Sequence, residues 1–474
     1  MAKDVTRAKL DENRLFPLEP AARAFAADLY GTVRDLPIVS PHGHTDPRWF
    51  AENEAFPDPA QLFVTPDHYV FRMLFSQGVS LDALGVPHAD GTRVETDGRK
   101  IWRVFAENFH LLRGTPSRMW LDHSFQEVFG LEGRLSAETA DHFYDHIADC
   151  LARPEYRPRA LFERFGIEAI ATTESPLDDL RWHRMIRESG WSGKVVTAYR
   201  PDPVVDPEFE GFAANVALLG ELAGTDATTW DGYLEAHRIR RAFFKGFGAT
   251  SSDHGHASAR TENLPRSEAV ALFEKALKGS CTAEEADAFR GHMLTEMARM
   301  SLDDGLVLQI HPGARRNHSA PMLAEFGRDK GFDIPGRTDY VAALKPLLDA
   351  VGLEPGLSII LFTLDETVYA RELAPLAGVY PSLKLGPAWW FNDSPEGMRR
   401  FREATTETAG FYNTVGFNDD TRAFCSIPAR HDVARRVDCA FLATLVGTGR
   451  LAEDEAFEVA QDLAYRLVKQ AYKL

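Results

Sequence analysis

Short apolar runs that end abruptly in polar or charged residues recur along the chain. The segments with this pattern are 36–44, 167–174, 194–202, 247–254, 306–311, 357–363, 383–393 and 413–422. Runs of this length and composition are typical of strands that are buried on both faces, as in parallel sheets. The pattern therefore predicts eight parallel strands.

Helical patterns separate most of these runs. They cover residues 178–189, 268–278, 283–302, 340–351 and 395–409. Alternating strands and helices favour right-handed crossovers, and eight strands suggest a closed barrel. We predict an α/β protein with a (β/α)8 TIM-type barrel. A doubly wound open sheet is the alternative, but no GxGxxG follows the first run.

The interval between the first and second predicted strands is far longer than a crossover requires. Residues 50–160 are rich in aromatic residues and helical in pattern, so we predict a helical insertion over the barrel mouth. Residues 1–35 are expected to form a helical lead-in, and residues 36–474 the catalytic barrel that the insertion interrupts. The tail from 431 to 474 predicts two amphipathic helices split at 447–449.

Composition narrows the class of protein. Of 474 residues, 44% are hydrophobic and 26% charged, which fits a globular chain. The net charge of −17 argues against nucleic acid or an anionic membrane as partner, although a small anion remains compatible with it. The four cysteines lack CxxC spacing and are expected to be buried, reduced thiols. With no apolar leader and no long apolar run, we expect a cytoplasmic protein.

Chemically active side chains lie at or just beyond the predicted strand ends. They are His42, His44, Arg200, His311, Trp390, Asp420 and Arg422. Active sites of TIM barrels are built from the loops at the carboxyl ends of the strands. This coincidence predicts an active site at the barrel mouth.

A metal site is predicted where the first and eighth strands meet. His42 and His44 face the same side of a strand, so both imidazoles can bind one divalent cation, for which we expect zinc. Either Asp420 or its neighbour Asp419 can supply a carboxylate from the eighth strand. His311 is either a further ligand or a hydrogen-bonding partner of the substrate. The competing interpretations are a solvated turn at Gly43 and a helix cap or ion pair at the aspartates.

The His, His and Asp pattern resembles that of the amidohydrolase superfamily, in which a metal commonly activates water. The lysine that bridges two metals in many members is absent, because the fourth run ends Ser251-Ser252-Asp253-His254. The sixth run ends without a histidine. The sequence thus supports at most one metal.

Within that superfamily the chain resembles the uronate isomerase, or glucuronate isomerase, family. The matching segments are 41–44, 67–69, 200–202, 252–254, 311–317, 389–393, 420–422 and 430–431, in order over nearly the whole chain. Two positions depart from the family pattern. Ser40 stands where Asp is usual, and the acidic Asp419 precedes Asp420.

The resemblance implies aldose–ketose isomerisation of D-glucuronate to D-fructuronate and of D-galacturonate to D-tagaturonate through an enediol. Tyr69 would carry the proton between C2 and C1, Asp420 the ring-opening proton, and His311 would assist. The substrate-binding candidates are His68, Arg200, Arg422 and Trp390, and Arg422 is also a catalytic candidate. Trp389 could line the pocket in place of Trp390. Asp253 and His254 are expected behind the site, and His256 and His318 on the surface.

Two alternatives remain open. One is a mononuclear metal-dependent hydrolase of the deaminase or lactonase type on the same barrel, which would yield a water-derived product. The other is a non-catalytic sugar-acid-binding barrel, which would bind without turnover. The sequence leaves the oligomeric state open and is compatible with a homo-oligomer.

Overall fold

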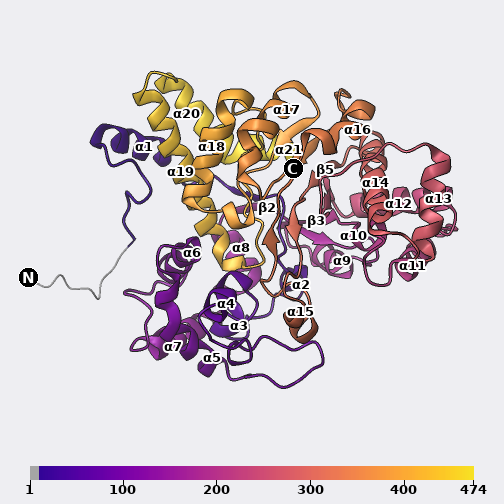
Figure 1. The fold of residues 1–474 in the computed structure, drawn as a ribbon. Coiled ribbons are helices and arrows are strands. Elements are labelled where there is room, and N and C mark those ends of the chain that lie inside the picture. Colours follow the sequence, from indigo (N-terminus) through magenta and orange to yellow (C-terminus); the bar gives the residue numbers. More distant parts are fainter. Residues whose placement is uncertain (1–9) are drawn as a thin grey trace, which may run out of the picture.

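A parallel sheet forms the centre of the computed structural model, which describes residues 10–474 (Figure 1). The strands are hydrogen-bonded in the order β1, β2, β3, β4, β5, β8, β9. Their bounds are Ile38–Ser40, Ile167–Glu174, Lys194–Tyr199, Ser251–His254, Val307–Ile310, Ile359–Leu361 and Leu383–Leu385. The predicted TIM-type barrel is confirmed, and all seven strands begin within predicted runs.

The eighth predicted strand is wrong as a regular element. Residues 413–422 form only a parallel bridge between Thr414 and Leu385, followed by irregular chain. The barrel closes next to it, where the backbone N–H of His44 donates to the carbonyl of Thr421 at 3.0 Å. Gly43 allows this approach, since a Cβ there would lie 3.2 Å from the Thr421 carbonyl oxygen.

The barrel interior is filled by branched apolar side chains and by the end of the chain. One buried cluster contains Val39, Val307 and Ile360 from three strands and Val415 from the segment that takes the place of an eighth strand, the last stave of the barrel. Val468 and Tyr472 belong to the same cluster. The last two belong to helix α21 (Leu467–Tyr472). The C-terminal helix therefore closes the amino-terminal end of the barrel.

The predicted crossover helices are present as α9 (Arg181–Glu188), α13 (Arg266–Leu277), α14 (Ala283–Asp304), α16 (Val341–Val351) and α18 (Pro395–Ala409). Three helices before β4 were not predicted: α10 (Asp202–Val205), α11 (Phe212–Ala223) and α12 (Trp230–Gly246). The run predicted from 247 begins as a strand only at Ser251, because Phe247 and Gly248 end α12.

Helices also occupy the long interval after β1. They are α2 (Pro47–Glu52), α3 (Pro59–Phe63), α4 (His68–Phe75), α5 (Gly98–Asn108), α6 (Pro116–His123), α7 (Ala140–Leu151) and α8 (Pro158–Arg164). Their apolar faces meet in an aromatic core that includes Trp102, Phe105, Phe109 and Phe125. Helices α3 to α7 gather below the strands in the view of Figure 1. The division into lead-in, barrel and insertion stays a prediction.

The two ends of the chain pack together. Helix α1 (Pro20–Val33) lies against α19 (Ile427–Gly447) and α20 (Glu453–Gln461), and a turn at 448–452 separates the last two. Asp432 of α19 pairs with Arg14 at 2.6 Å and accepts from Tyr30 at 2.5 Å. The tail thus contains the two predicted helical regions, and α21 extends the second.

Between β5 and α16 the chain leaves the barrel a second time, in an excursion that was not predicted. It contains a two-stranded antiparallel pair, β6 (Ala314–Arg315) and β7 (Ile334–Pro335), with α15 (Ala320–Phe326) between them. All four cysteines are free; Cys281 is half-buried and the others are buried. Among residues 10–474, no helix combines the length and apolarity that a membrane span requires.

Candidate active site

A cavity of about 760 Å³ opens at the carboxyl ends of the strands. Its wall contains every site residue that the sequence predicted: His42, His44, His68, Tyr69, Arg200, His311, Trp390, Asp420 and Arg422. The structure therefore brings together side chains that are up to 380 positions apart in the sequence.

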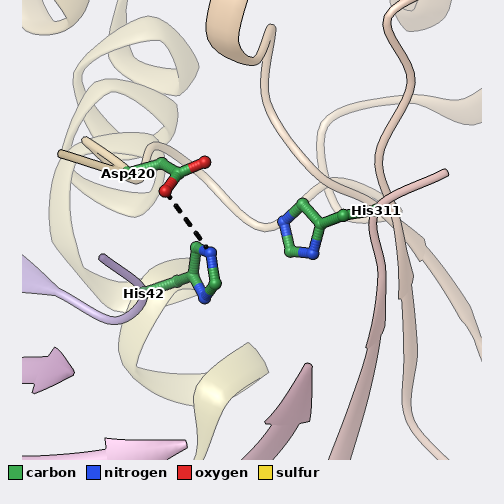
Figure 2. A group of neighbouring side chains, drawn as sticks. All are labelled: His42, His311 and Asp420. Carbon is green, nitrogen blue, oxygen red and sulfur yellow. Dashed lines mark ion pairs between the residues drawn. The ribbon is translucent and has the colours of Figure 1, made fainter. Parts of the chain in front are cut away.

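Two imidazoles from the end of β1 converge on one carboxylate oxygen. Nε2 of His42 lies 3.4 Å and Nε2 of His44 lies 3.3 Å from Oδ1 of Asp420. Figure 2 shows His311 approaching the same place from β5, and its ring stacks on His42 with centroids 4.6 Å apart. Ligand atoms of His42, His311 and Asp420 all lie within 4.8 Å of one another.

Asp420 is held in an uncommon backbone conformation, with φ at 34°. Such left-handed geometry at a non-glycine residue is concentrated at functional sites. Nε1 of Trp389 donates to Oδ2, so Oδ1 is left facing the imidazoles. Burial alone would raise the pKa of Asp420, but His42 and His44 outweigh it and hold that pKa well below its usual range.

The neighbouring Asp419 does not face the cavity. Its Oδ1 lies 3.2 Å from Nε2 of His431 in α19, and its side chain is 1% exposed. Between the two aspartates that the sequence left open, the structure therefore places Asp420 at the imidazoles.

Helix α4 presents His68 and Tyr69 to the cavity from its first turn. Asp67 caps the helix by accepting from the backbone N–H of Tyr69 at 2.8 Å. Burial, reinforced by the charge of Arg422, lowers the pKa of His68 to about 3. His68 is therefore neutral at physiological pH.

Tyr69 lies beside a buried cation. The guanidinium of Arg430 sits 5.3 Å from the Tyr69 ring and forms an ion pair with Asp393. Burial nevertheless raises the pKa of Tyr69 well above its ordinary value, because Arg430 offsets only part of the desolvation. The hydroxyl is therefore protonated at neutral pH in the free protein.

The two arginines that the sequence predicted at the site differ in their partners. Nε of Arg200 donates to Asp202 at 2.9 Å and Nη1 donates to Asp253 at 2.9 Å, so two carboxylates surround one guanidinium. Arg422 is half-buried and forms no ion pair within residues 10–474. The unmatched positive charge of this pair of arginines is that of Arg422.

Both tryptophans of the pair line the cavity. Trp389 is 4% exposed and reaches Asp420, whereas Trp390 is half-buried with φ at 50°. Arg316 of the excursion after β5 lies over the Trp390 ring at 5.1 Å. Both side chains therefore border the cavity, and Trp389 also belongs to a buried apolar cluster.

Several wall residues were missed by sequence reasoning. The excursion after β5 contributes Arg316, Asn317, Asp329 and Asp333. Asn317 and Asp329 have positive φ, and Gly327 and Gly331 flank Asp329; this glycine spacing was the available signal. His256 was expected on the surface but is 5% exposed and lines the cavity, whereas His318 is exposed as expected.

The fold and the cluster together define a class. A TIM-type barrel with two histidines after the first strand and an aspartate at its last stave is the arrangement of amidohydrolase-like enzymes. Two nitrogens and one carboxylate oxygen are compatible with a divalent metal.

Comparisons with known proteins give the family. The family model described as glucuronate isomerase matches residues 16–472. A uronate isomerase of Rhizobium meliloti is 69% identical over 468 residues, covering 99% of this chain and all of that protein. The crystal structure of glucuronate isomerase from Caulobacter crescentus matches with a TM-score of 0.97 at 61% identity, covering 98% and 97% of the two chains. The chain belongs to the glucuronate isomerase family.

This family membership confirms the predicted resemblance and the predicted isomerase. A structure described as a metal-dependent hydrolase of Lactobacillus casei shares the fold alone, with a TM-score of 0.53 at 15% identity over 94% of this chain and 97% of that one. The hydrolase alternative is therefore not favoured.

Proposed function

We propose that the cavity isomerises D-glucuronate to D-fructuronate and D-galacturonate to D-tagaturonate through an enediol, with the residues named below. The observation that carries this assignment is the meeting of an ionised carboxylate, the neutral imidazole of His68, a phenol and an arginine without an ion pair around one space. The reaction moves a proton from C2 to C1 and needs these kinds of group.

We propose His42, His44 and Asp420 as the ligands of one zinc ion. Oδ1 of Asp420 is buried and accepts no hydrogen bond from the described residues, while two Nε2 atoms face it. An orphaned carboxylate oxygen between imidazoles fits a divalent cation, and two nitrogens and an oxygen suit zinc. A bound metal ion would polarise a substrate oxygen as a Lewis acid.

Arg422 is proposed to bind the uronate carboxylate or the enediolate oxygens. It forms no ion pair with a described carboxylate, although its charge helps to lower the pKa of Asp329 across the cavity, so its guanidinium is available to pair with a substrate anion. Arg200 keeps Nη2 for the substrate beyond its bonds to Asp202 and Asp253. It orients an oxygen and adds little net charge.

Proton transfer is assigned to two groups, Asp420 and Tyr69, and a third group, His311, is assigned to hold the substrate. Asp420 is ionised and can accept the ring-opening proton. Tyr69 is the group proposed to carry the proton between C2 and C1. Its phenol is protonated in the free protein, and Arg430 is the neighbouring cation that would stabilise a phenolate. His311 would hold a substrate oxygen through Nε2, which has no described protein partner.

The test is incubation of the purified, metal-replete protein with D-glucuronate in D2O, followed by NMR. We expect a ketose to form with loss of the C2 proton signal. A product that has gained water would support the hydrolase, and tight binding without exchange or ketose would support the binding barrel. Either result would overturn the isomerase assignment. A cytoplasmic location and assembly as a homo-oligomer stay predictions.

A further inference from the structure

Asp253 lies between two elements that each supply a cavity residue. It belongs to β4, the strand between β3 and β5, and pairs in register with Gln309 of β5. Arg200 immediately follows β3 and His311 immediately follows β5. Because parallel strands end at the same edge, the carboxylate of the middle strand can reach both neighbours.

Both oxygens of Asp253 are used in this way. Oδ1 accepts from Nδ1 of His311 at 2.7 Å, and Oδ2 accepts from Nη1 of Arg200 at 2.9 Å. The side chain is fully buried, at 0% exposure. A buried carboxylate with two charge-assisted or short hydrogen bonds has a fixed orientation, and it fixes the orientation of its partners.

The bond to Nδ1 determines which nitrogen of His311 faces the cavity. A neutral imidazole that donates through Nδ1 carries its free lone pair on Nε2. Nε2 is buried, has no partner among the described residues, and belongs to a side chain that stacks on His42. His311 is therefore presented as an acceptor on the side of Asp420 and His42.

Asp202 shows that the two contacts of Asp253 have different importance. Arg200 already has an ion pair with Asp202, which accepts from Nε and also from the backbone N–H of Gly255. Neutralising Arg200 therefore does not require Asp253. What Asp253 adds is a link between Arg200 and His311 through one rigid carboxylate.

We infer that Asp253 is a positioning residue that sets the orientation of Arg200 and the tautomer of His311 together. This inference deepens the proposed function and rests on it for its kinetic part. Asp253 acts through its two partners and is not itself assigned contact with the substrate.

The decisive variant is Asp253→Asn, which keeps the shape but not the two acceptors. An amide offers one oxygen and one NH2 group, so it must face either Nδ1–H of His311 or Nη1–H of Arg200 with a donor. We expect kcat for D-glucuronate to fall roughly 10- to 100-fold, as for loss of other groups that orient active-site residues. Thermal unfolding shows whether the variant is folded.

The matched control is Asp202→Asn, which removes a carboxylate from Arg200 and leaves His311 untouched. We expect KM to rise with kcat within about twofold of the wild type. An equal loss of kcat in Asp202→Asn would overturn the inference, because loss of the Arg200 ion pair alone would then explain both variants.

A second readout does not depend on turnover. In protein labelled with ¹⁵N-histidine, the ring signals of His311, assigned with His311→Gln, should show protonated Nδ1 and unprotonated Nε2. Asp253→Asn should shift this pattern and Asp202→Asn should not. An unchanged His311 pattern in Asp253→Asn would overturn the inference, whereas a wild-type protein without turnover would overturn the proposed function alone.

Discussion

At the scale of single residues, the structure distinguishes two arginines that look equivalent in the sequence. Arg200 and Arg422 both follow strand-like runs, but Arg200 is enclosed by two carboxylates and Arg422 is unpaired in the described structure. On this basis we propose that Arg200 orients the substrate and that Arg422 attracts its anionic group. This difference gives a prediction for Arg422, and the proposed proton transfer gives a second one for Tyr69.

Arg422→Met should lower kcat/KM for D-glucuronate by roughly 10- to 100-fold, the value of a hydrogen bond to a charged group. The effect should appear mainly in KM if the arginine binds the carboxylate. Steady-state kinetics measure it, and Arg399→Met on the exposed face of α18 is the control for loss of a positive charge. An unchanged KM together with unchanged kcat would refute the assignment.

Tyr69→Phe should lower kcat by about 100-fold or more, the usual contribution of a proton-transfer group, with little change in KM. Loss of the C2 proton signal in D2O should slow in parallel. Tyr412→Phe, which removes a hydroxyl that donates to Asp462 outside the cavity, controls for the substitution. Near-normal exchange in Tyr69→Phe would show that another group carries this proton.

At the scale of elements, the polar cluster between β2, β3 and α9 shows how an outward-facing carboxyl is buried. Thr172 and Thr197 both donate to Oε2 of Glu174, and Nε2 of His183 lies 3.8 Å away. Burial raises the pKa of Glu174 to about 8, helped by Asp178 and Asp46. The carboxyl is thus neutral in the folded protein at pH 7.

The raised pKa of Glu174 predicts a specific pH dependence of stability. Between pH 4.5 and about 8 the folded state holds a proton that the unfolded state releases, so stability falls as pH rises. Burial also lowers the pKa of His183 to about 4, so its opposite effect ends near pH 6.5. From pH 6.5 to 8 the free energy of unfolding should fall by about 2 kcal/mol, and the melting temperature should fall with it. Glu174→Gln should lose the slope between pH 7 and 8, because the buried Asp393, whose pKa is raised to about 7, contributes mainly below pH 7. A variant with the wild-type slope between pH 7 and 8 would contradict the assignment.

Helix α21 gives a second prediction at this scale. Tyr472 is fully buried at the barrel base, and its hydroxyl accepts from Asn418 at 3.1 Å. Tyr472→Ala should destabilise the protein by about 3 to 5 kcal/mol, whereas Tyr472→Phe should cost only about 1. Thermal or chemical unfolding of both variants measures the difference. Equal losses would mean that packing of the ring against the interior contributes little.

Elements with a strong local pattern were predicted from the sequence, and the others were not. The strands stand out because buried parallel strands are continuous apolar runs, and α18 was bounded correctly by its amphipathic pattern. The excursion with Arg316 and Asp329 has no such period, because its residues are placed by contacts with α4 and Trp390. For the same reason nothing local distinguished the buried His256 from the exposed His318.

At the scale of the whole molecule, the barrel has a seam. The described residues show no ladder between β1 and the last stave; the two meet through the His44 to Thr421 bond and the side chains of His42, His44 and Asp420. A cation bound by these side chains would join the first and last staves. Metal binding and global stability should therefore be coupled.

Chelation should lower the melting temperature by several degrees, and one equivalent of Zn²⁺ per chain should restore it. Metal content and thermal unfolding measure this together. His42→Asn should lose both the metal and the response, whereas the exposed His318→Asn should keep both. Stoichiometric zinc without any thermal effect would show that the ion does not stabilise the seam.

The position of α21 has a consequence for substrate entry and product release. Because Val468 and Tyr472 close the base of the barrel, the cavity is a blind well rather than a tunnel. The ketose must leave by the opening through which the aldose enters, past α4 and the excursion after β5. At the end of each turnover, the departing product and the next substrate molecule therefore compete for the same cavity opening.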